Sequence, residues 1–202
     1  MKNLIFNPYT HIAGTKAFLS GISGIIITGI LCYLSHVHLD GIIDIHFADA
    51  GNSYIYLTEG IIDLACIVLI FSLLGLLLVG FRFRFIDLIG TMAIARLPII
   101  IVPLFAMIFP QGKISDYLMF TFLKIGTPVT ISNMDIIGFV FMMLIVILIL
   151  IWTIALMYNA FKICINIKGA KMALTFIAGL IIAEVISKII FISLNITIIP
   201  TR

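Results

Sequence analysis

The chain has 202 residues, of which 63% are hydrophobic and 10% are charged, and its mean hydropathy is +1.31. Soluble proteins carry about a quarter charged residues, so this composition cannot cover a surface exposed to water. The net charge of +3 lies mostly in short basic connections between apolar blocks. This charge pattern therefore indicates how a membrane protein is oriented in its bilayer. We expect the lipid bilayer as a partner and no binding of nucleic acid.

The apolar residues gather in five blocks of about 20 residues, each long enough to cross roughly 30 Å of hydrocarbon as a helix. The blocks cover residues 17–37, 59–80, 87–109, 135–161 and 171–194. Asn7-Pro8 predicts a short interfacial helix before the first block. Ser132-Asn133 before Asp135 predicts a cap for the fourth. We expect one domain over residues 1–202, an all-α membrane protein built as a bundle of five transmembrane helices.

The distribution of lysine and arginine predicts which way the bundle faces, because cytoplasmic connections carry an excess of these residues. With five spans, one side of the membrane receives seven cationic residues and the other three. The seven are Lys2, Lys16, Arg82, Arg84, Lys162, Lys168 and Lys171; the three are Lys113, Lys124 and Arg202. We expect a cytosolic N-terminus and an exoplasmic C-terminus.

Four ionisable residues fall inside the predicted spans, where charge is costly and tends to be paired or functional. They are Asp63, Arg96, Glu184 and Lys188. Counting 1.5 Å per residue puts Arg96 and Glu184 near the middle, and Asp63 and Lys188 nearer the exoplasmic surface. We hypothesise two interhelical pairs, Arg96 with Glu184 and Asp63 with Lys188. The spacing of Glu184 and Lys188 also allows them to pair with each other along one helix.

Two prolines follow Arg96 closely in the third span. Each removes a backbone donor and disturbs the carbonyl four residues earlier, so Pro98 and Pro103 predict a kink that frees backbone carbonyls near the arginine. Such a kink is a typical substrate site in transporters with broken helices. Small residues at helix-packing spacing predict close helix contacts on the first and fifth spans. They are Ser20, Gly24 and Thr28, and Gly179, Ala183 and Ser187.

The connection after the first span alternates polar and apolar residues around Gly41, the pattern of a half-buried hairpin. A turn at Asp40-Gly41-Ile42 would pair Leu39 with Ile43, His38 with Asp44 and His36 with His46. All the polar members would then share one face of this short exoplasmic β-hairpin-like loop. Histidine and aspartate favour Zn²⁺, so we consider two alternatives: a zinc site, and a solvated face without metal. The candidate ligands are His36, His38, Asp44 and His46.

Several segments give the chain a resemblance to the Yip1 family of small five-span membrane proteins, particularly its bacterial members. They are Asn7-Pro8, Asp87 with Gly90-Thr91, Ala95-Arg96-Leu97-Pro98, Trp152, Tyr158-Asn159-Ala160-Phe161-Lys162 with Gly169 and Lys171, and Ala183 to Lys188. The resemblance implies five spans, a cytosolic N-terminus and an exoplasmic C-terminus. It suggests the bacterial cytoplasmic membrane. Eukaryotic members engage small GTPases through a long N-terminal region, whereas here about 16 residues precede the first span.

No arrangement of an enzyme active site, such as HExxH, a P-loop or GxGxxG, occurs in the sequence. The sequence therefore favours a non-enzymatic membrane scaffold or interaction protein, with a membrane-protein partner or a second copy of the chain. The alternative is a small transporter or channel component that uses Arg96, Glu184 and the kinked third helix. A weaker third alternative is a metal-responsive membrane protein that uses the histidine-rich hairpin.

Overall fold

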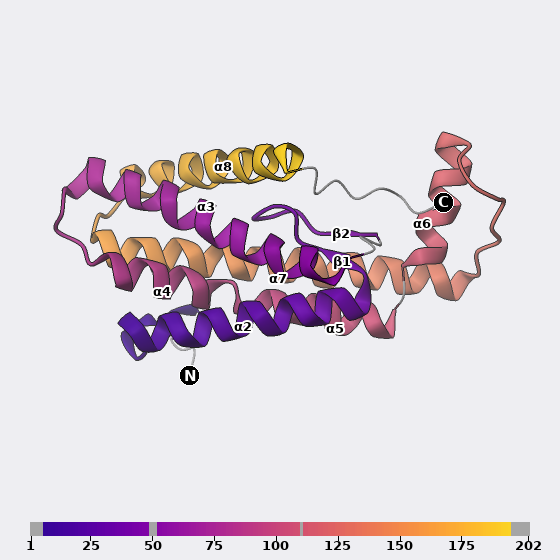
Figure 1. The fold of residues 1–202 in the computed structure, drawn as a ribbon, viewed down its shortest axis with the longest axis horizontal. Helices are drawn as coiled ribbons and strands as arrows, with labels where there is room; N and C mark the ends of the chain where they lie inside the picture. Colours follow the sequence, from indigo (N-terminus) through magenta and orange to yellow (C-terminus); the bar gives the residue numbers. More distant parts are fainter. Residues whose placement is uncertain (1–5, 49–51, 110, 195–202) are drawn as a thin grey trace.

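The structure, a computed structural model, describes residues 6–48, 52–109 and 111–194, and it is an elongated helical bundle (Figure 1). Five of its helical segments are long and apolar enough to cross a membrane. They are α2 (Gly14–Ser35), α3 (Ser53–Val79), the segment Phe85–Ile108, α7 (Asn133–Ile165) and α8 (Ala170–Ser193). The predicted all-α membrane protein with five spans is therefore confirmed.

Short elements connect or precede these helices. They are η1 (Pro8–Thr10), the strands β1 (Val37–His38) and β2 (His46–Phe47), α6 (Gly112–Leu118) and the π-helical turn η3 (Met119–Leu123). The turn η1 packs on α7, because the Tyr9 hydroxyl donates to the carbonyl of Leu156 at 3.0 Å. The predicted cap of the fourth span is also present, since Ser132 and Asp135 form a capping box at the start of α7.

The third span is broken where the sequence predicts a kink. Helix α4 (Phe85–Ala95) ends just before Arg96, the 3-10 turn η2 (Leu97–Ile100) follows, and α5 (Ile101–Ile108) completes the crossing. Pro98 lies in the 3-10 turn, as expected from its missing N–H. Pro103 lies in the first turn of α5, which begins two residues earlier, and Ile99, four residues before this proline, lies in the 3-10 turn. In a first helical turn the N–H groups have no partner inside the helix, so a proline there breaks nothing.

Helices α2 and α4 approach each other very closely, and glycine makes this approach possible. A Cβ atom built on Gly90 would lie 2.8 Å from the carbonyl oxygen of Gly14, and one on Gly21 would lie 2.7 Å from the carbonyl carbon of Ala93. In the stripe of small residues predicted on α2, Gly24 and Thr28 are buried but Ser20 is exposed. The contact thus uses a face next to the one expected. On α8 the three residues of the predicted stripe, Gly179, Ala183 and Ser187, are all buried.

The predicted hairpin forms, but in a different register. Val37 pairs with Phe47 and His38 with His46, so residues 39–45 form a wide connection in place of a tight turn at Gly41. The register differs from the expected one because contacts with helices α3 and α8 hold this connection open. Figure 1 shows it folded back along the bundle beside the ends of α3 and α8.

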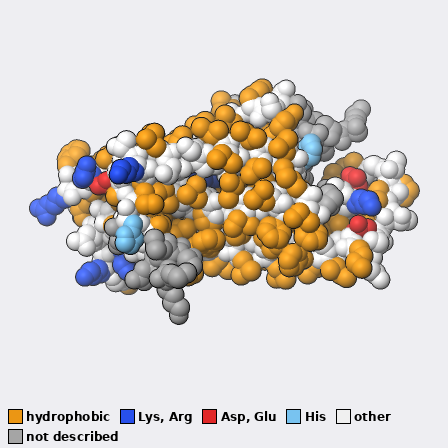
Figure 2. Space-filling model, turned by 90° about the horizontal axis from the view of Figure 1, so that it is seen from below, with side chains coloured by type: hydrophobic (Ala, Val, Ile, Leu, Met, Phe, Trp, Pro, Cys, Tyr) orange, Lys and Arg blue, Asp and Glu red, His pale blue; other side chains and the backbone are white. Residues whose placement is uncertain are grey.

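Charge is divided unequally between the two ends of the molecule, with an apolar band between them (Figure 2). The end where α2, α4 and α8 begin carries six exposed cationic side chains. They are Lys16, Arg82, Arg84, Lys162, Lys168 and Lys171. Among the described residues of this end, Asp87 is the carboxylate, and it pairs with Arg84 at 3.6 Å. Most of the other acidic side chains lie toward the hairpin end.

Candidate functional site

A buried ion pair joins the second and third spans in the middle of the bundle. Nη2 of Arg96 donates to Oδ2 of Asp63 at 2.7 Å, and the Ser187 hydroxyl on α8 donates to Oδ1 of the same carboxylate at 2.6 Å. Arg96 is 4% exposed and Asp63 is fully buried. Both residues lie about 15 Å from the start of their helices, which begin at opposite ends. The pair therefore lies close to the midplane of the predicted hydrocarbon layer.

The hairpin reaches the same region from the other direction. The backbone N–H of Leu39 donates to Oε2 of Glu59 at 3.0 Å, and that of Ile43 donates to Oε2 of Glu184 at 3.1 Å. At 1.5 Å per residue, these glutamates lie about 9 and 14 Å from the nearer ends of α3 and α8. Non-helical backbone at such depth must be covered by protein. The two glutamates supply partners for two N–H groups of the hairpin; the contact with Glu59 is buried and the contact with Glu184 is exposed.

His38 is turned into the core, where its Nδ1 lies 2.6 Å from Oε1 of Glu59 and both side chains are fully buried. Its ring stacks on Tyr56 of α3, with 4.3 Å between the ring centroids, and on His46 at 5.4 Å. Glu59 and Asp63 are four residues apart, on one face of α3. That face carries two carboxylates, and each of them contacts a different part of the polar core.

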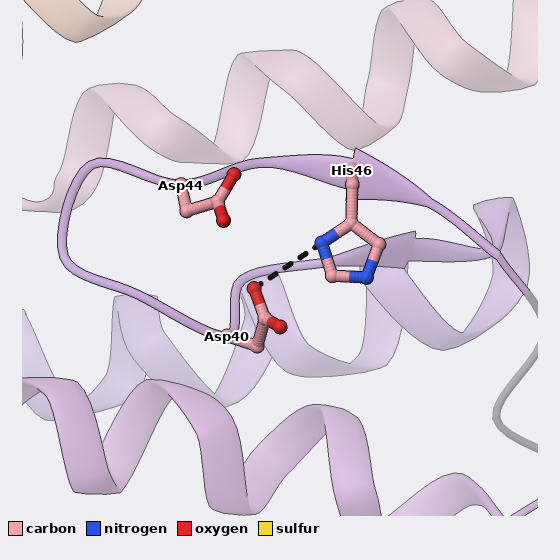
Figure 3. Close-up of side chains that lie close together, drawn as sticks. All are labelled: Asp40, Asp44 and His46. Carbon is pink, nitrogen blue, oxygen red and sulfur yellow. Dashed lines mark ion pairs between the residues drawn. The ribbon is translucent and has the colours of Figure 1, made fainter. Parts of the chain in front are cut away.

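A second group of charges lies at the tip of the hairpin (Figure 3). Nδ1 of His46 lies 3.2 Å from Oδ1 of Asp40, and the ligand atoms of Asp40, Asp44 and His46 are all within 4.8 Å of one another. The ammonium group of Lys188 donates to Asp40 at 2.8 Å and also to Asp44. Burial raises the pKa of Asp40, but the hydrogen bonds from His46 and Lys188 outweigh this and lower it to about 2.

A small cavity lies beside the ion pair and is lined partly by Arg96. It has room for about one water molecule. Nη1 of Arg96 is buried and has no hydrogen-bond partner among the described residues. Leu39 of the hairpin forms part of the wall, together with residues of α2, α3 and η2. Arg96 thus lines a space for about one water molecule and also carries a buried nitrogen without a partner among the described residues.

The half of the bundle toward the cationic end is filled with apolar side chains. Phe71 of α3 packs on Phe161 of α7 and Phe176 of α8, with 4.7 and 5.4 Å between the ring centroids. Leu88 and Met92 on α4 are fully buried in the same cluster. This layer separates the polar core from the cationic end, whereas the hairpin covers the core from the other end.

Both hypothesised ion pairs are wrong in their partners. Arg96 binds Asp63, and Lys188 binds Asp40 and Asp44, while Glu184 accepts a backbone N–H of the hairpin. No ion pair joins Glu184 to Lys188 among the described residues. Depth along a helix does not determine which side of the helix faces which neighbour. The hairpin also enters at the depth of Lys188, and it supplies carboxylates that a count of residues along the spans does not include.

The four proposed zinc ligands do not come together as one set. Asp44 and His46 lie with Asp40, whereas His38 binds Glu59 and His36 is exposed at the end of α2. The expected register would have placed all the polar residues on one face, and the observed register turns His38 inward. Lys188 already donates hydrogen bonds to Asp40 and Asp44, so its ammonium group compensates their negative charge.

Two residues of the site were not singled out by the sequence. Glu59 was placed at the boundary of the second span, but α3 begins at Ser53 and carries this residue inside. Its spacing of four from Asp63 is the signal that would have put both on one helix face. Asp40 was placed in the turn, and nothing local to the hairpin indicates that it binds Lys188.

Comparison of the chain with family models, curated proteins and solved structures gives no match.

Proposed function

We propose that this chain is a non-enzymatic membrane scaffold or interaction protein whose polar core fixes the arrangement of its helices. The observation that carries the proposal is that the charges of the polar core, whether buried or half-buried, contact other segments of the same chain. Asp63 connects α3 to Arg96 and to α8, and Glu59 and Glu184 hold the hairpin. Buried ion pairs add little net stability, and we propose that here they select one packing of the helices over its alternatives. A fixed shape is what a scaffold needs.

The outward faces of α7 and α8 support contact with lipid or with another membrane protein, including a second copy of the chain. Leu148 and Ile151 on α7 and Ile181 on α8 are large apolar side chains that remain exposed. The excess of cations at one end supports a cytosolic N-terminus. We also propose membership of the Yip1 family and a location in the bacterial cytoplasmic membrane. The five spans support this proposal, as does the position of the described ends of the chain at opposite ends of the bundle.

Photo-crosslinking in native membranes tests the interaction function. A photo-reactive residue in place of Leu148, exposed on α7, is expected to give a discrete protein adduct. The matched control is the same replacement at Met157, which is fully buried on α7, and it should give no intermolecular adduct. Adducts with lipid alone at Leu148, and equally at other exposed positions of α7 and α8, would argue against a protein partner.

A small transporter or channel component is the second candidate, favoured by the unpaired Nη1 of Arg96, by the small cavity that this residue lines and by the break in the third span. The two candidates differ in the behaviour of Arg96→Ala. A scaffold should lose folded yield in this variant, and Arg96→Ala with Asp63→Ala should regain it. A transporter should keep its folded yield but lose solute flux in proteoliposomes. Unchanged yield together with lost flux would contradict the scaffold.

A further inference from the structure

We propose that the cationic end of the bundle is a docking surface for the headgroups of anionic phospholipids. Its centre is the segment of residues 80–85 that joins α3 to α4, the arginine loop. A scaffold works with or without a preference for one kind of lipid, so this proposal and the proposed function succeed or fail independently. Three observations carry it: the convergence of cations at this end, their lack of acidic partners, and the apolar side chains exposed beside them.

The cations of this end come from three segments that the fold brings together. They are the start of α2, the arginine loop, and the connection between α7 and α8. A Cβ atom built on Gly14 would lie 3.4 Å from Oδ1 of Asp87, so the start of α2 lies against the start of α4. A Cβ atom built on Gly75 would lie 2.7 Å from Ile165, near the end of α7, and 2.9 Å from Phe83 of the arginine loop. The three segments therefore present their cations at one end of the molecule (Figure 2).

The positive charge of this end is largely uncompensated. Among the described residues, six exposed cations face one carboxylate, Asp87, which pairs with Arg84 at 3.6 Å. Arg84 nevertheless remains mostly exposed. Helices α2, α4 and α8 all begin here, and the positive ends of their dipoles add to the potential. A cluster of about four to eight lysine and arginine residues beside a transmembrane helix is typical of a surface that attracts anionic headgroups.

The arginine loop combines these charges with large apolar side chains, in the order Phe81-Arg82-Phe83-Arg84-Phe85. Phe83 packs against the core, whereas Phe81 is 93% exposed. Leu77, four residues earlier on α3, is 82% exposed. The apolar surface of α3 thus continues into the loop, and the cations begin where it ends. Insertion of Phe81 between the headgroups and the acyl chains would remove its apolar surface from water.

This combination favours a phospholipid over a soluble anion. An arginine binds phosphate oxygens through two parallel hydrogen bonds, and both Arg82 and Arg84 are exposed. A soluble phosphate or a nucleic acid could bind the arginines, but it would leave Phe81 in water. A phospholipid meets both needs, since its phosphate reaches the arginines and its acyl chains cover the phenylalanine. A zwitterionic headgroup also carries a cation, which the uncompensated charge repels, so a net negative headgroup is preferred.

Lipid titration followed by native mass spectrometry tests the preference. The full chain in a neutral detergent is titrated with phosphatidylglycerol, or with phosphatidylcholine that has the same acyl chains. Phosphatidylglycerol should bind more tightly, and Arg82→Gln with Arg84→Gln should weaken its binding about tenfold or more, because each cation near the headgroups adds to the attraction. The matched control is Lys113→Gln with Lys124→Gln, which removes two exposed cations from the opposite end and should leave the affinity unchanged.

Three results of this titration would overturn the proposal. The first is equal affinity of the natural chain for the two lipids, which requires no variant to fold. The second is an equal loss of affinity in the control variant, because any cation would then serve. The third is displacement of phosphatidylglycerol by an equal concentration of inorganic phosphate, which would show a site for a soluble anion.

Fluorescence tests the insertion of the arginine loop without changing its charge. Phe81→Trp is made in a chain with Trp152→Phe, so that the introduced residue is the single tryptophan. The chain is reconstituted in vesicles of phosphatidylglycerol and phosphatidylcholine in equal parts. Lipids brominated near the top of their acyl chains should quench the emission strongly, and iodide in the buffer should quench it weakly. Stronger quenching by iodide would show that the loop lies in water, and the proposed contact with phospholipid would fall.

Discussion

The guanidinium group of Arg96 and the carboxylate of Asp63 form an ion pair of 2.7 Å in the middle of the bundle. They come from the break in the third span and from a regular turn of α3. Because the helix ends at Ala95, Arg96 leaves the α-helical path at the depth of Asp63. The proline-induced break and the ion pair therefore belong to one arrangement, in which the irregular backbone positions the cation.

Removal of one member of this pair should destabilise the bundle more than removal of both. Arg96→Met leaves Asp63 buried without its cation, and we expect a loss of about 3–5 kcal/mol in the free energy of unfolding. Asp63→Leu combined with Arg96→Met should recover most of it. Arg84→Met, which breaks an exposed pair, should cost at most about 1 kcal/mol. Unfolding followed by circular dichroism in mixed micelles measures all three; a double variant weaker than either single one would contradict the pairing.

The contact of Glu59 with the hairpin predicts that two substitutions of this residue lower stability to different extents. Glu59→Leu removes the acceptor for the Leu39 N–H and leaves His38 unpaired, which should cost about 1–3 kcal/mol. Glu59→Gln retains one carbonyl oxygen and should cost less. Thermal unfolding monitored by size-exclusion chromatography gives the order of stability. If the glutamine variant were the less stable of the two, the carboxylate would not be acting as the acceptor.

The close approach of α2 and α4 predicts that single methyl groups are poorly tolerated there. Gly90→Ala and Gly21→Ala would each place a carbon atom against backbone atoms, and overpacking of this kind costs about 1–3 kcal/mol. Gly112→Ala is the control, since a Cβ atom there meets nothing within 4 Å. The measurement is the folded fraction after heating in detergent. Equal stability of Gly90→Ala and Gly112→Ala would mean that the helices are farther apart than described.

The low pKa of Asp40 predicts an acid-sensitive hairpin. Burial opposes ionisation of this carboxyl, but the hydrogen bonds from His46 and Lys188 prevail and lower its pKa to about 2. An aspartate titrates at about 3.9 in an unfolded chain. The stabilisation by Asp40 is therefore full above about pH 4 and is lost as the pH falls toward 2.

Asp40→Asn should accordingly be less stable than the natural chain at neutral pH, and the difference should disappear as the pH approaches 2. Melting temperatures at a series of pH values measure this. Asp116→Asn, in the connection between the third and fourth spans and away from the hairpin tip, is the control. A difference for Asp40→Asn that stays constant over the whole acid range would show that the carboxylate is not held in its ionised form by His46 and Lys188.

The sequence by itself determined the number of spans, the break at Pro98, the capping box at Ser132 and the presence of polar residues in the core. These properties depend on local composition and backbone chemistry: apolar length for a helix, a missing N–H for proline, and a side-chain acceptor at a helix start. Each of them is set by a few neighbouring residues. Asp63, Arg96, Glu184 and Lys188 were identifiable because charge inside an apolar block is rare and costly.

Only the tertiary structure decided which of these charges meet. The rotation of each helix about its axis follows from packing at positions such as Gly21 and Gly90, where the closest contact sets the angle. The depth of the hairpin follows from acceptors on two distant helices, Glu59 and Glu184. Lys188 was thus assigned to Asp63 from depth along the spans, but it binds Asp40 and Asp44 in the connection after the first span, which a count along the spans does not include. Contacts between segments far apart in sequence fix both the register of the hairpin and the pairing of the core.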